Sequence, residues 1–325
     1  MPRWQRLPLL LYGIIIAVVA LTIYLMGTIG LLMTAMAPRL PWSAGALHLV
    51  VLSGGMTLVA GVLAIVDVVV LLPAKRKRRD IMVNPPPVRD LTVVLTAYND
   101  EASIGLAVDD FRSHPLVRRV IVVDNDSTDG TADVAGRHGA VVVRETQRGY
   151  GRCVYRALRE GLSSGDTDLT LLCEGDATFR AFDIDKFMAY IPHADIVSGT
   201  RIVEQLRAAQ TQLTSFMYYG NFFVGKLLEA KHLGKGTFTD VGTTYKLCRN
   251  SALERLLPVL NPAVNLEFNA HFLDRALAGP IHVVECPITF HRRVGISKGG
   301  NASNWRAFGV GMRMIRGIIA GWPRT

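Results

Sequence analysis

Cysteine is scarce in this sequence: four cysteines occur among 325 residues, and no two of them form a CxxC pair. Cys153, Cys173, Cys248 and Cys286 also lack histidines at metal-ligand spacing. These absences exclude zinc-finger sites and CxxC redox motifs. We expect four reduced and mostly buried thiols, as is usual in a cytosolic domain.

Nucleic-acid-binding signatures are absent too, although the chain is basic, with 36 Lys and Arg residues against 27 Asp and Glu residues. The sequence has no basic helix with interleaved aromatic residues and no RNA-binding motif. Internal repeats and low-complexity stretches are missing as well. A basic run at residues 75–79 accounts for part of the net charge of +9, and we expect no nucleic-acid partner.

Hydrophobic residues make up 50% of the chain, and their excess is concentrated near the N-terminus. Two apolar runs, 7–36 and 46–73, are each long enough to cross a hydrocarbon core, which takes about 20 helical residues. The first run is too long for the core of a signal peptide, which has about 7–15 residues. We therefore predict an integral membrane protein with two transmembrane helices.

Basic residues flank the two apolar runs on one side. Arg3 and Arg6 precede the first run, the basic residues 75–79 follow the second, and the connector 37–45 carries only Arg39. By the positive-inside rule, both termini and everything after residue 80 face the cytoplasm. The basic run is expected to lie against anionic headgroups, where each Lys or Arg contributes about 1 kcal/mol.

Strand and helix patterns alternate after a proline-rich spacer at 84–87, which marks a domain boundary. The predicted strands are 91–96, 117–124, 140–144 and 169–173, and the predicted helices are 103–112, 131–138 and 151–162. This alternation predicts an α/β fold, a mostly parallel sheet with helices on both faces. The predicted organisation is a membrane anchor (1–80), a cytosolic domain (81–300) and an amphipathic tail (301–325).

Two carboxylates, Glu174 and Asp176, follow the predicted strand 169–173, with Gly175 between them. Two charges at the end of an apolar strand are costly unless something compensates them. Mg²⁺ or Mn²⁺ would do so, because hard oxygen ligands suit these ions, and water and substrate phosphates usually fill their remaining positions. A solvated acidic turn is the alternative interpretation.

A second polar turn follows the predicted strand 117–124. We expect Asp126 and Asp129 to be structural, because Asp129 or Ser127 can cap the helix that follows. Asp124 is the last residue of the strand and can accept a hydrogen bond from a base edge or a ribose, as the acidic residue of dinucleotide folds does.

Segments in a fixed order resemble family 2 glycosyltransferases. The first are VVLTAYNDE (93–101), DNDSTDGT (124–131), QRGYG (147–151) and EGD (174–176). The later ones, GTR (199–201), DVGTTYK (240–246) and ECPITFHRRVGISK (285–298), are similar to motifs of the dolichol-phosphate mannose synthase group. Together they cover about 91–298. Three positions depart from the family pattern: Glu174 replaces an Asp, Asn125 replaces a second Asp, and Thr178 stands where Gln is frequent.

The resemblance implies a GT-A fold, a UDP- or GDP-sugar donor, a divalent metal, inversion at the anomeric carbon and a polyprenyl-phosphate acceptor. For the nucleotide it implies binding by Ala97, Tyr98, Glu101, Asp124, Arg148 and Gly175. For the metal it implies Glu174 and Asp176. Arg292 and Lys298 match a mobile basic loop that closes over the diphosphate, and Arg201 matches a residue that binds the acceptor phosphate, with Arg207 and Lys246 as further candidates.

A phosphate acceptor needs no general base, because a phosphate monoester has a second pKa of about 6 and is already anionic. It needs cations that position it, while the metal stabilises the departing diphosphate. We therefore predict Asp176 and Arg201 as catalytic residues. Asp240 is added because it is the plausible base for a glycolipid synthase, an alternative function in which a hydroxyl group is the acceptor.

A processive polysaccharide synthase and a non-catalytic scaffold also stay open as functions. The synthase would carry Thr-Glu-Asp and Gln-x-x-Arg-Trp motifs, and neither occurs after residue 200. A scaffold with a degenerate transferase fold would tolerate the changes at Asn125 and Glu174. The oligomeric state also stays open, a homo-oligomer included.

The tail 304–322 places Arg306, Arg313 and Arg316 among apolar residues, with a tryptophan near each end. Each arginine would cost about 2.5–3.5 kcal/mol at the centre of a bilayer, which argues against a third transmembrane helix. The pattern is typical of a helix in the membrane interface. A helix packed on the catalytic domain is the alternative.

Overall fold

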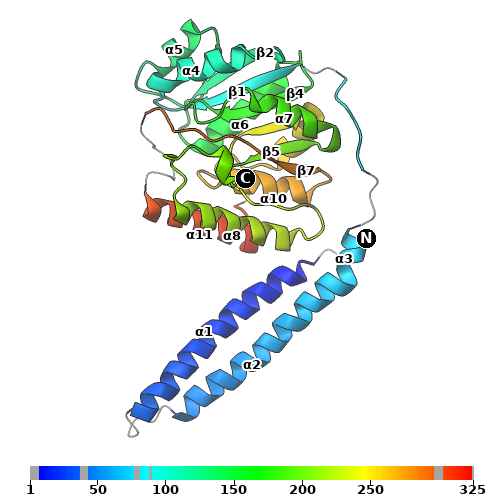
Figure 1. Cartoon of the computed structure of the whole chain (residues 1–325), viewed down its shortest axis with the longest axis vertical. Helices are drawn as coiled ribbons and strands as arrows, with labels where there is room; N and C mark the ends of the chain where they lie inside the picture. The colour runs from blue at the N-terminus through cyan, green and yellow to red at the C-terminus, as the bar shows by residue number, and fades with distance from the viewer. Residues whose placement is uncertain (1–6, 37–42, 77–80, 88–89, 296–302, 324–325) are drawn as a thin grey trace. The chain divides into compact units, whose positions relative to one another are not determined.

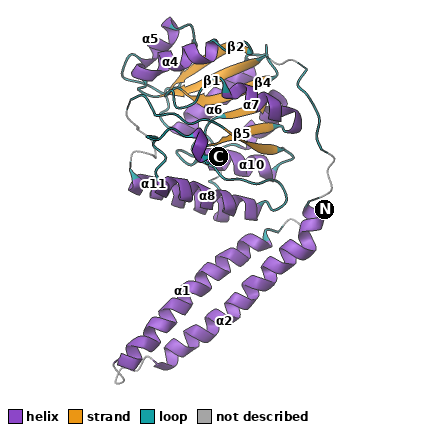
Figure 2. Ribbon diagram, in the orientation of Figure 1, coloured by secondary structure: helices purple, strands orange, loops and turns teal. Residues whose placement is uncertain are grey.

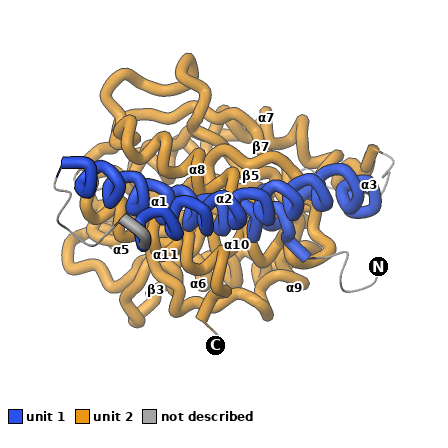
Figure 3. The backbone as a smooth tube through the Cα atoms, turned by 90° about the horizontal axis from the view of Figure 1, so that it is seen from below, with its two compact units in different colours: residues 1–79, 229–235 blue, residues 80–228, 236–325 orange. Residues whose placement is uncertain are grey.

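The computed structural model (Figure 1) describes all residues except 1–6, 37–42, 77–80, 88–89, 296–302 and 324–325. The chain forms two compact units, which Figure 3 colours separately. One comprises residues 1–79 and 229–235, and the other comprises residues 80–228 and 236–325.

The first unit contains the two apolar helices. Helix α1 spans Leu9–Met36, and α2 (Ser43–Ile65) continues through a π-helical segment η2 (Val66–Leu71) into α3 (Leu72–Lys75). Among the described residues, Leu9–Met36 and Gly45–Lys75 are long and apolar enough to cross a membrane, with mean hydropathies of 2.6 and 2.5. Both coincide with the runs that the sequence predicts as transmembrane helices.

Small residues at intervals of seven form the contact between these helices. The buried positions are Gly13, Ala20 and Gly27 on one helix and Ala46, Ser53 and Ala60 on the other. A Cβ atom at Gly13 would lie 2.9 Å from the carbonyl oxygen of Ala60, so only glycine permits this approach. Small residues at such spacing let apolar helices pack closely where no hydrophobic effect drives them together.

Asp67 lies fully buried on the same face of the second helix. Its carboxylate accepts a hydrogen bond from the backbone N–H of Leu10 at 2.7 Å and pairs with Lys75. The N–H of Leu10 belongs to the first turn of α1, where backbone donors lack partners within the helix. Asp67 is therefore a structural residue that joins the two helices.

The second unit is built on a seven-stranded sheet (Figure 2). Its strands are β1 (Leu91–Ala97), β2 (Val117–Asp124), β3 (Val141–Arg144), β4 (Leu169–Glu174), β5 (Ile196–Thr200), β6 (Lys246–Arg249) and β7 (Val283–Pro287). The order is β3-β2-β1-β4-β6-β5-β7. All neighbours are parallel except β6, which runs antiparallel to β4 and β5.

Helices cover both faces of this sheet. They are α4 (Glu101–Arg112), α5 (Thr131–Arg137), α6 (Tyr150–Ser163), α7 (Asp183–Tyr190), α9 (Asn250–Leu256) and α10 (Phe268–Ala278). Helices α8 (Ser215–Lys231) and α11 (Asn304–Ala320) are drawn below the sheet in Figure 1. Val93 of β1 belongs to a core with α4 and α7, whereas its neighbour Val94 belongs to a core with α6 and α10. The predicted α/β architecture is confirmed, and so is the burial of the four free cysteines.

Helix α11 is amphipathic and packs on the second unit with one face. Val310, Met314 and Ile318 are buried in the core that α10 also lines. Beyond its end, the indole N–H of Trp322 donates to the Asp274 carboxylate of α10 at 2.7 Å. One face of the tail is therefore packed on the second unit, as the alternative interpretation expected, while the predicted contact of its other face with a membrane interface stays a prediction.

Candidate active site

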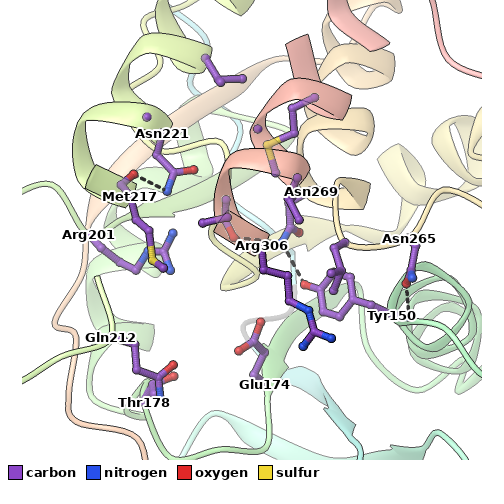
Figure 4. A pocket seen from close by; sticks show the side chains of 18 of the residues that line it. Tyr150, Glu174, Thr178, Arg201, Gln212, Met217, Asn221, Asn265, Asn269 and Arg306 are labelled. Atoms are coloured by element: carbon purple, nitrogen blue, oxygen red, sulfur yellow. Dashed lines mark hydrogen bonds between the residues drawn. The ribbon is translucent and has the colours of Figure 1, made fainter. Parts of the chain in front are cut away.

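A cavity of about 1120 Å³ opens at the carboxyl ends of the parallel strands (Figure 4). Its polar wall carries Tyr98, Asp100, Asn125, Arg148, Glu174, Asp176, Thr178, Arg201 and Arg293. Its apolar wall carries Phe216, Met217, Phe223 and Val224 of α8 and Phe308, Val310, Met312, Met314 and Ile315 of α11. One cavity thus has a charged end and an apolar end.

The two predicted metal ligands lie on the polar wall. Asp176 is 2% exposed, and its Oδ1 accepts hydrogen bonds from the backbone N–H and the hydroxyl of Thr178 at 3.1 and 2.6 Å. Burial and repulsion from Glu174 raise the pKa of Asp176 to about 6, against the opposing effect of Arg293. Glu174 accepts a hydrogen bond from the hydroxyl of Thr244 at 2.6 Å.

These two carboxylates fit a divalent cation. A cation would relieve the repulsion that raises the pKa of Asp176. Among the described residues no group of three His, Cys, Asp or Glu side chains forms a complete protein cage. Mg²⁺ and Mn²⁺ suit such a site, since they commonly take one or two carboxylates and leave other positions to water and phosphates. Thr178 orients Asp176 through its two hydrogen bonds.

Asp124 ends β2 opposite Ala97, the last residue of β1. Its Oδ2 accepts a hydrogen bond from the N–H of Ser127 at 3.3 Å, while its buried Oδ1 has no partner among the described residues. A buried acceptor without a partner is costly, so this oxygen suits an N–H or O–H donor of a ligand. Ala97 and Tyr98 line the cavity, whereas Asp124 itself is buried next to Ala97 and is not a lining residue.

Arg148 reaches the cavity from the loop before α6. Its Nε donates to Asp126 at 3.0 Å, and its guanidinium lies 5.9 Å from the ring centroid of Tyr98. Hydrogen bonds from Arg144 and Arg148 lower the pKa of Asp126. The loop itself depends on Gly149, whose φ of 140° other residues rarely adopt.

Arg201 and Asp240 form a buried ion pair, and Arg201 lines the cavity. The Nε and Nη2 of Arg201 donate to the Asp240 carboxylate at 2.7 and 2.8 Å. The carboxylate also accepts from the backbone N–H groups of Arg201 and Gly242. Burial disfavours its ionised form, but Arg201 outweighs this effect and lowers the pKa of Asp240. With four hydrogen bonds its acceptor capacity is used, so Asp240 positions Arg201 and is unsuited to act as a base.

Several predicted residues lie away from the cavity lining. Arg207 pairs with Glu204 at 2.8 Å, and Glu101 accepts from Gly130 at 3.0 Å beside a smaller cavity of about 580 Å³. Lys246 is fully buried, which lowers its pKa to about 8, and it donates to Asn269 at 3.3 Å. Arg292 donates to Gln210 at 3.4 Å. Gly175 donates its N–H to Thr96, and Lys298 lies outside the described residues.

The structure brings other residues to the site that sequence reasoning missed. Arg293 pairs with Asp100 at 2.8 Å and with Asp176 at 2.9 Å. Behind Glu174, the Thr244 hydroxyl also contacts Tyr150, and Asn269 donates to the Tyr150 hydroxyl at 2.9 Å. Arg293 stands next to Arg292 in the basic motif, which was a usable signal. The Thr244 contact joins segments 70 residues apart and left no signal in the sequence.

The fold is that of a GT-A transferase. The profile of glycosyl transferase family 2 matches residues 92–257, half of the chain. The chain therefore belongs to family 2 of the glycosyltransferases.

Two curated relatives are named as transferases of dolichyl phosphate and undecaprenyl phosphate. The dolichyl-phosphate hexose transferase of Haloferax volcanii is 28% identical over 64% of this chain and 86% of its own. The undecaprenyl-phosphate mannosyltransferase of Micrococcus luteus is 27% identical over 65% and 87%. An uncharacterised glycosyltransferase of Mycobacterium tuberculosis is 38% identical over 34% of this chain, and the match spans only 48% of that relative.

Solved structures share the fold at low sequence identity. Glucosyl-3-phosphoglycerate synthase from Mycobacterium tuberculosis, in complex with phosphoglyceric acid, superposes with a TM-score of 0.52 at 18% identity, over 78% of this chain and 84% of that one. The same enzyme in complex with Mn²⁺, UDP and glucosyl-3-phosphoglycerate gives a TM-score of 0.51. At this identity the likeness establishes the fold alone.

Proposed function

We propose that this protein transfers one sugar from a UDP- or GDP-sugar to a polyprenyl phosphate at the cytosolic face of a membrane, with inversion at the anomeric carbon. The observation that carries the proposal is the single cavity that joins the carboxylates Glu174 and Asp176 to an apolar wall on α8 and α11. A substrate with an anionic head and a long apolar chain matches both ends. The names of the archaeal and Micrococcus relatives support the same acceptor class.

On the donor side, Glu174 and Asp176 would hold a divalent cation, which would supply positive charge to neutralise the departing diphosphate. Asp124 offers its unpartnered Oδ1 to the nucleoside, with Ala97 and Tyr98 beside it. Arg293 lies next to Asp176 and can turn from this carboxylate to a donor phosphate.

On the acceptor side, Arg201 is held rigidly by Asp240 and faces the cavity. A phosphate oxygen held there attacks the anomeric carbon from the face opposite the leaving diphosphate, which inverts its configuration. No base is required, because the phosphate is already anionic at neutral pH. The hydrogen-bonded state of Asp240 disfavours a glycolipid synthase, in which this residue would have to take a proton.

Membrane attachment is proposed at two places. Helix α1 and the helix Gly45–Lys75 anchor the chain, with the basic run 75–79 and the catalytic domain in the cytoplasm. Helix α11 exposes apolar side chains opposite its packed face, with Trp305 at 85%, Phe308 at 49% and Met312 at 48%. These side chains suit the membrane interface, where the acceptor phosphate lies.

The proposal is tested by transfer assays on membranes that carry the full chain. Labelled UDP- and GDP-sugars are supplied with Mn²⁺ and polyprenyl phosphate, and the expected product is soluble in chloroform and labile to mild acid. Asp176→Asn should abolish transfer, whereas Asp185→Asn removes an exposed carboxylate on α7 and should not.

Each different outcome of this assay indicates a different function. An acid-stable product would indicate a hydroxyl acceptor and a glycolipid synthase. A product that stays at the origin as a long glycan would indicate a processive synthase. Absence of product from every donor, together with no cellular effect of Asp176→Asn, would favour a non-catalytic scaffold.

A further inference from the structure

Four arginines line the cavity: Arg148, Arg201, Arg293 and Arg306. Three are neutralised by carboxylates, Arg148 by Asp126, Arg201 by Asp240, and Arg293 by Asp100 and Asp176. Among the described residues, the guanidinium of Arg306 makes no ion pair. The cavity thus contains one arginine whose charge is available to an anionic ligand.

Arg306 lies in the first turn of α11, where its backbone N–H is capped by the Ser303 side chain at 3.2 Å. This places the residue at the border of the apolar wall, since Ala307 and Val310 also line the cavity. Figure 4 shows its guanidinium pointing into the cavity on the side of Glu174. An apolar chain along α11 would therefore bring its head group close to Arg306.

A phosphate monoester that carries up to two negative charges needs more than Arg201 can supply. The Arg201–Asp240 pair has no net charge, and two of the guanidinium nitrogens already donate to the carboxylate. The other predicted acceptor cations are occupied elsewhere, because Arg207 pairs with Glu204 and Lys246 is fully buried. With the cation and Arg293 assigned to the donor diphosphate, the described lining of the cavity offers no further positively charged side chain for the acceptor unless α11 provides it.

We propose that Arg306 is the second cation for the acceptor phosphate, contributed by the C-terminal helix. The inference rests on the proposed function and adds a residue to it. Arg201 approaches the phosphate from the sheet, and Arg306 approaches it from the helix that also borders the prenyl chain. A charge-assisted hydrogen bond from arginine to phosphate is short and stronger than a neutral one.

The test compares Arg306→Gln, Arg306→Lys and the matched control Arg313→Gln in full-length protein reconstituted in phosphatidylcholine membranes. Arg313 lies on the same helix, is 52% exposed and pairs with Glu267 outside the cavity. In Arg306→Gln the KM for polyprenyl phosphate should rise by about 10-fold or more, while the KM for the nucleotide sugar stays unchanged. Arg306→Lys should restore part of the loss, and Arg313→Gln should behave as wild type.

Three results would overturn the inference while leaving the proposed function intact. The acceptor KM of Arg306→Gln could be unchanged. The donor KM could rise instead, which would assign Arg306 to the diphosphate. The acceptor KM of Arg306→Gln could rise only when anionic lipids are added to the membranes, which would show that Arg306 contacts the head groups of these lipids. If wild type transfers no sugar to polyprenyl phosphate, the proposed function and the inference both fall.

Discussion

At the scale of single residues, Asn125 explains a departure from the family pattern. Its side-chain amide donates to the carbonyls of Glu145 and Gln147 at 3.2 and 2.9 Å, and its Oδ1 accepts from the N–H of Gly149 at 2.9 Å. A carboxylate could serve Gly149 but could not donate to either carbonyl. Asparagine thus holds the loop that carries Arg148.

We expect Asn125→Asp to destabilise the second unit by about 1–3 kcal/mol, because it leaves two carbonyls facing a carboxylate. The loop 145–149 should become mobile, and the KM for the nucleotide sugar should rise because Arg148 loses its position. Thermal unfolding and donor titration measure the two effects. Unchanged values in both would show that the amide is dispensable.

The buried pair Arg201–Asp240 gives a second prediction. Removing one partner leaves an uncompensated buried charge and should cost about 3–5 kcal/mol, as in Asp240→Leu. The double variant Arg201→Leu with Asp240→Leu should recover most of this stability, since an apolar pair is often as stable as a buried ion pair. It should remain inactive, because Arg201 is lost. Transfer activity in the double variant would contradict the role given to Arg201.

At the scale of elements, α11 combines two glycines that allow a matched experiment. Gly311 lines the cavity, and a Cβ atom there would meet nothing within 4 Å. Gly309 lies outside the cavity lining, and its nearest contact would be Arg313 at 3.7 Å. Both substitutions to leucine should favour the helix by up to about 1 kcal/mol.

In Gly311→Leu the new side chain should occupy space in the cavity without unfolding the protein. The KM for a long-chain polyprenyl phosphate should therefore rise. A short-chain acceptor should be affected much less, because its tail does not reach the apolar wall. Gly309→Leu should keep wild-type values for both acceptors. Equal effects of the two variants would argue against an acceptor chain along this helix.

The contact of α10 with the C-terminal segment should depend on pH through His271. Its Nε2 accepts a hydrogen bond from the N–H of Asn261 at 2.9 Å, and its ring packs edge-on against Trp322. Burial, assisted by Arg275, lowers the pKa of His271 to about 4. The folded state therefore binds the proton less well than the unfolded state.

This histidine contributes stability above its unfolded pKa of about 6.5, and the contribution falls progressively between pH 6.5 and 4, by up to about 3 kcal/mol. His271→Gln keeps an acceptor for Asn261 but does not titrate. Its unfolding midpoint should change less over this pH range than that of wild type. If the unfolding midpoints of the two proteins changed with pH in parallel, the role given to His271 would be contradicted.

At the scale of the whole molecule, the burial of all four native cysteines makes the topology measurable. A cysteine introduced into the connector 37–42 should react with a membrane-impermeant maleimide on intact cells. A second one at the exposed Glu254 of α9 should react only after permeabilisation. The reverse pattern would place the catalytic domain on the outer side.

Much of the fold is predictable because its signals are local. The first strands and helices match their predicted bounds within two residues, for example β2 at Val117–Asp124. Strand β6, by contrast, is only four residues long and pairs antiparallel between β4 and β5, which depends on contacts far apart in the chain. Its motif was visible in the sequence, but its place in the sheet was not.

The site residues also divide into those that local sequence signals predict and those that depend on contacts far apart in the chain. Glu174 ends β4, and Asp176 and Arg201 follow the carboxyl ends of β4 and β5, so their convergence follows from the topology. Arg292 and Arg293 are adjacent in an extended loop, and successive side chains of such a loop point in opposite directions. Only the backbone path decides that Arg293 meets Asp176. The arrival of Arg306 from α11 depends on helix packing, which no local pattern encodes.

The cavity with one charged and one apolar end has a consequence for turnover. The proposed reaction changes the head of the lipid and leaves its chain intact, so the apolar wall binds substrate and product equally well. The wall also binds the unchanged chain equally well in the transition state, so this binding lowers KM without accelerating the chemical step. The glycosylated lipid should therefore compete with fresh acceptor, and its escape into the bilayer should limit the steady-state rate once the product accumulates.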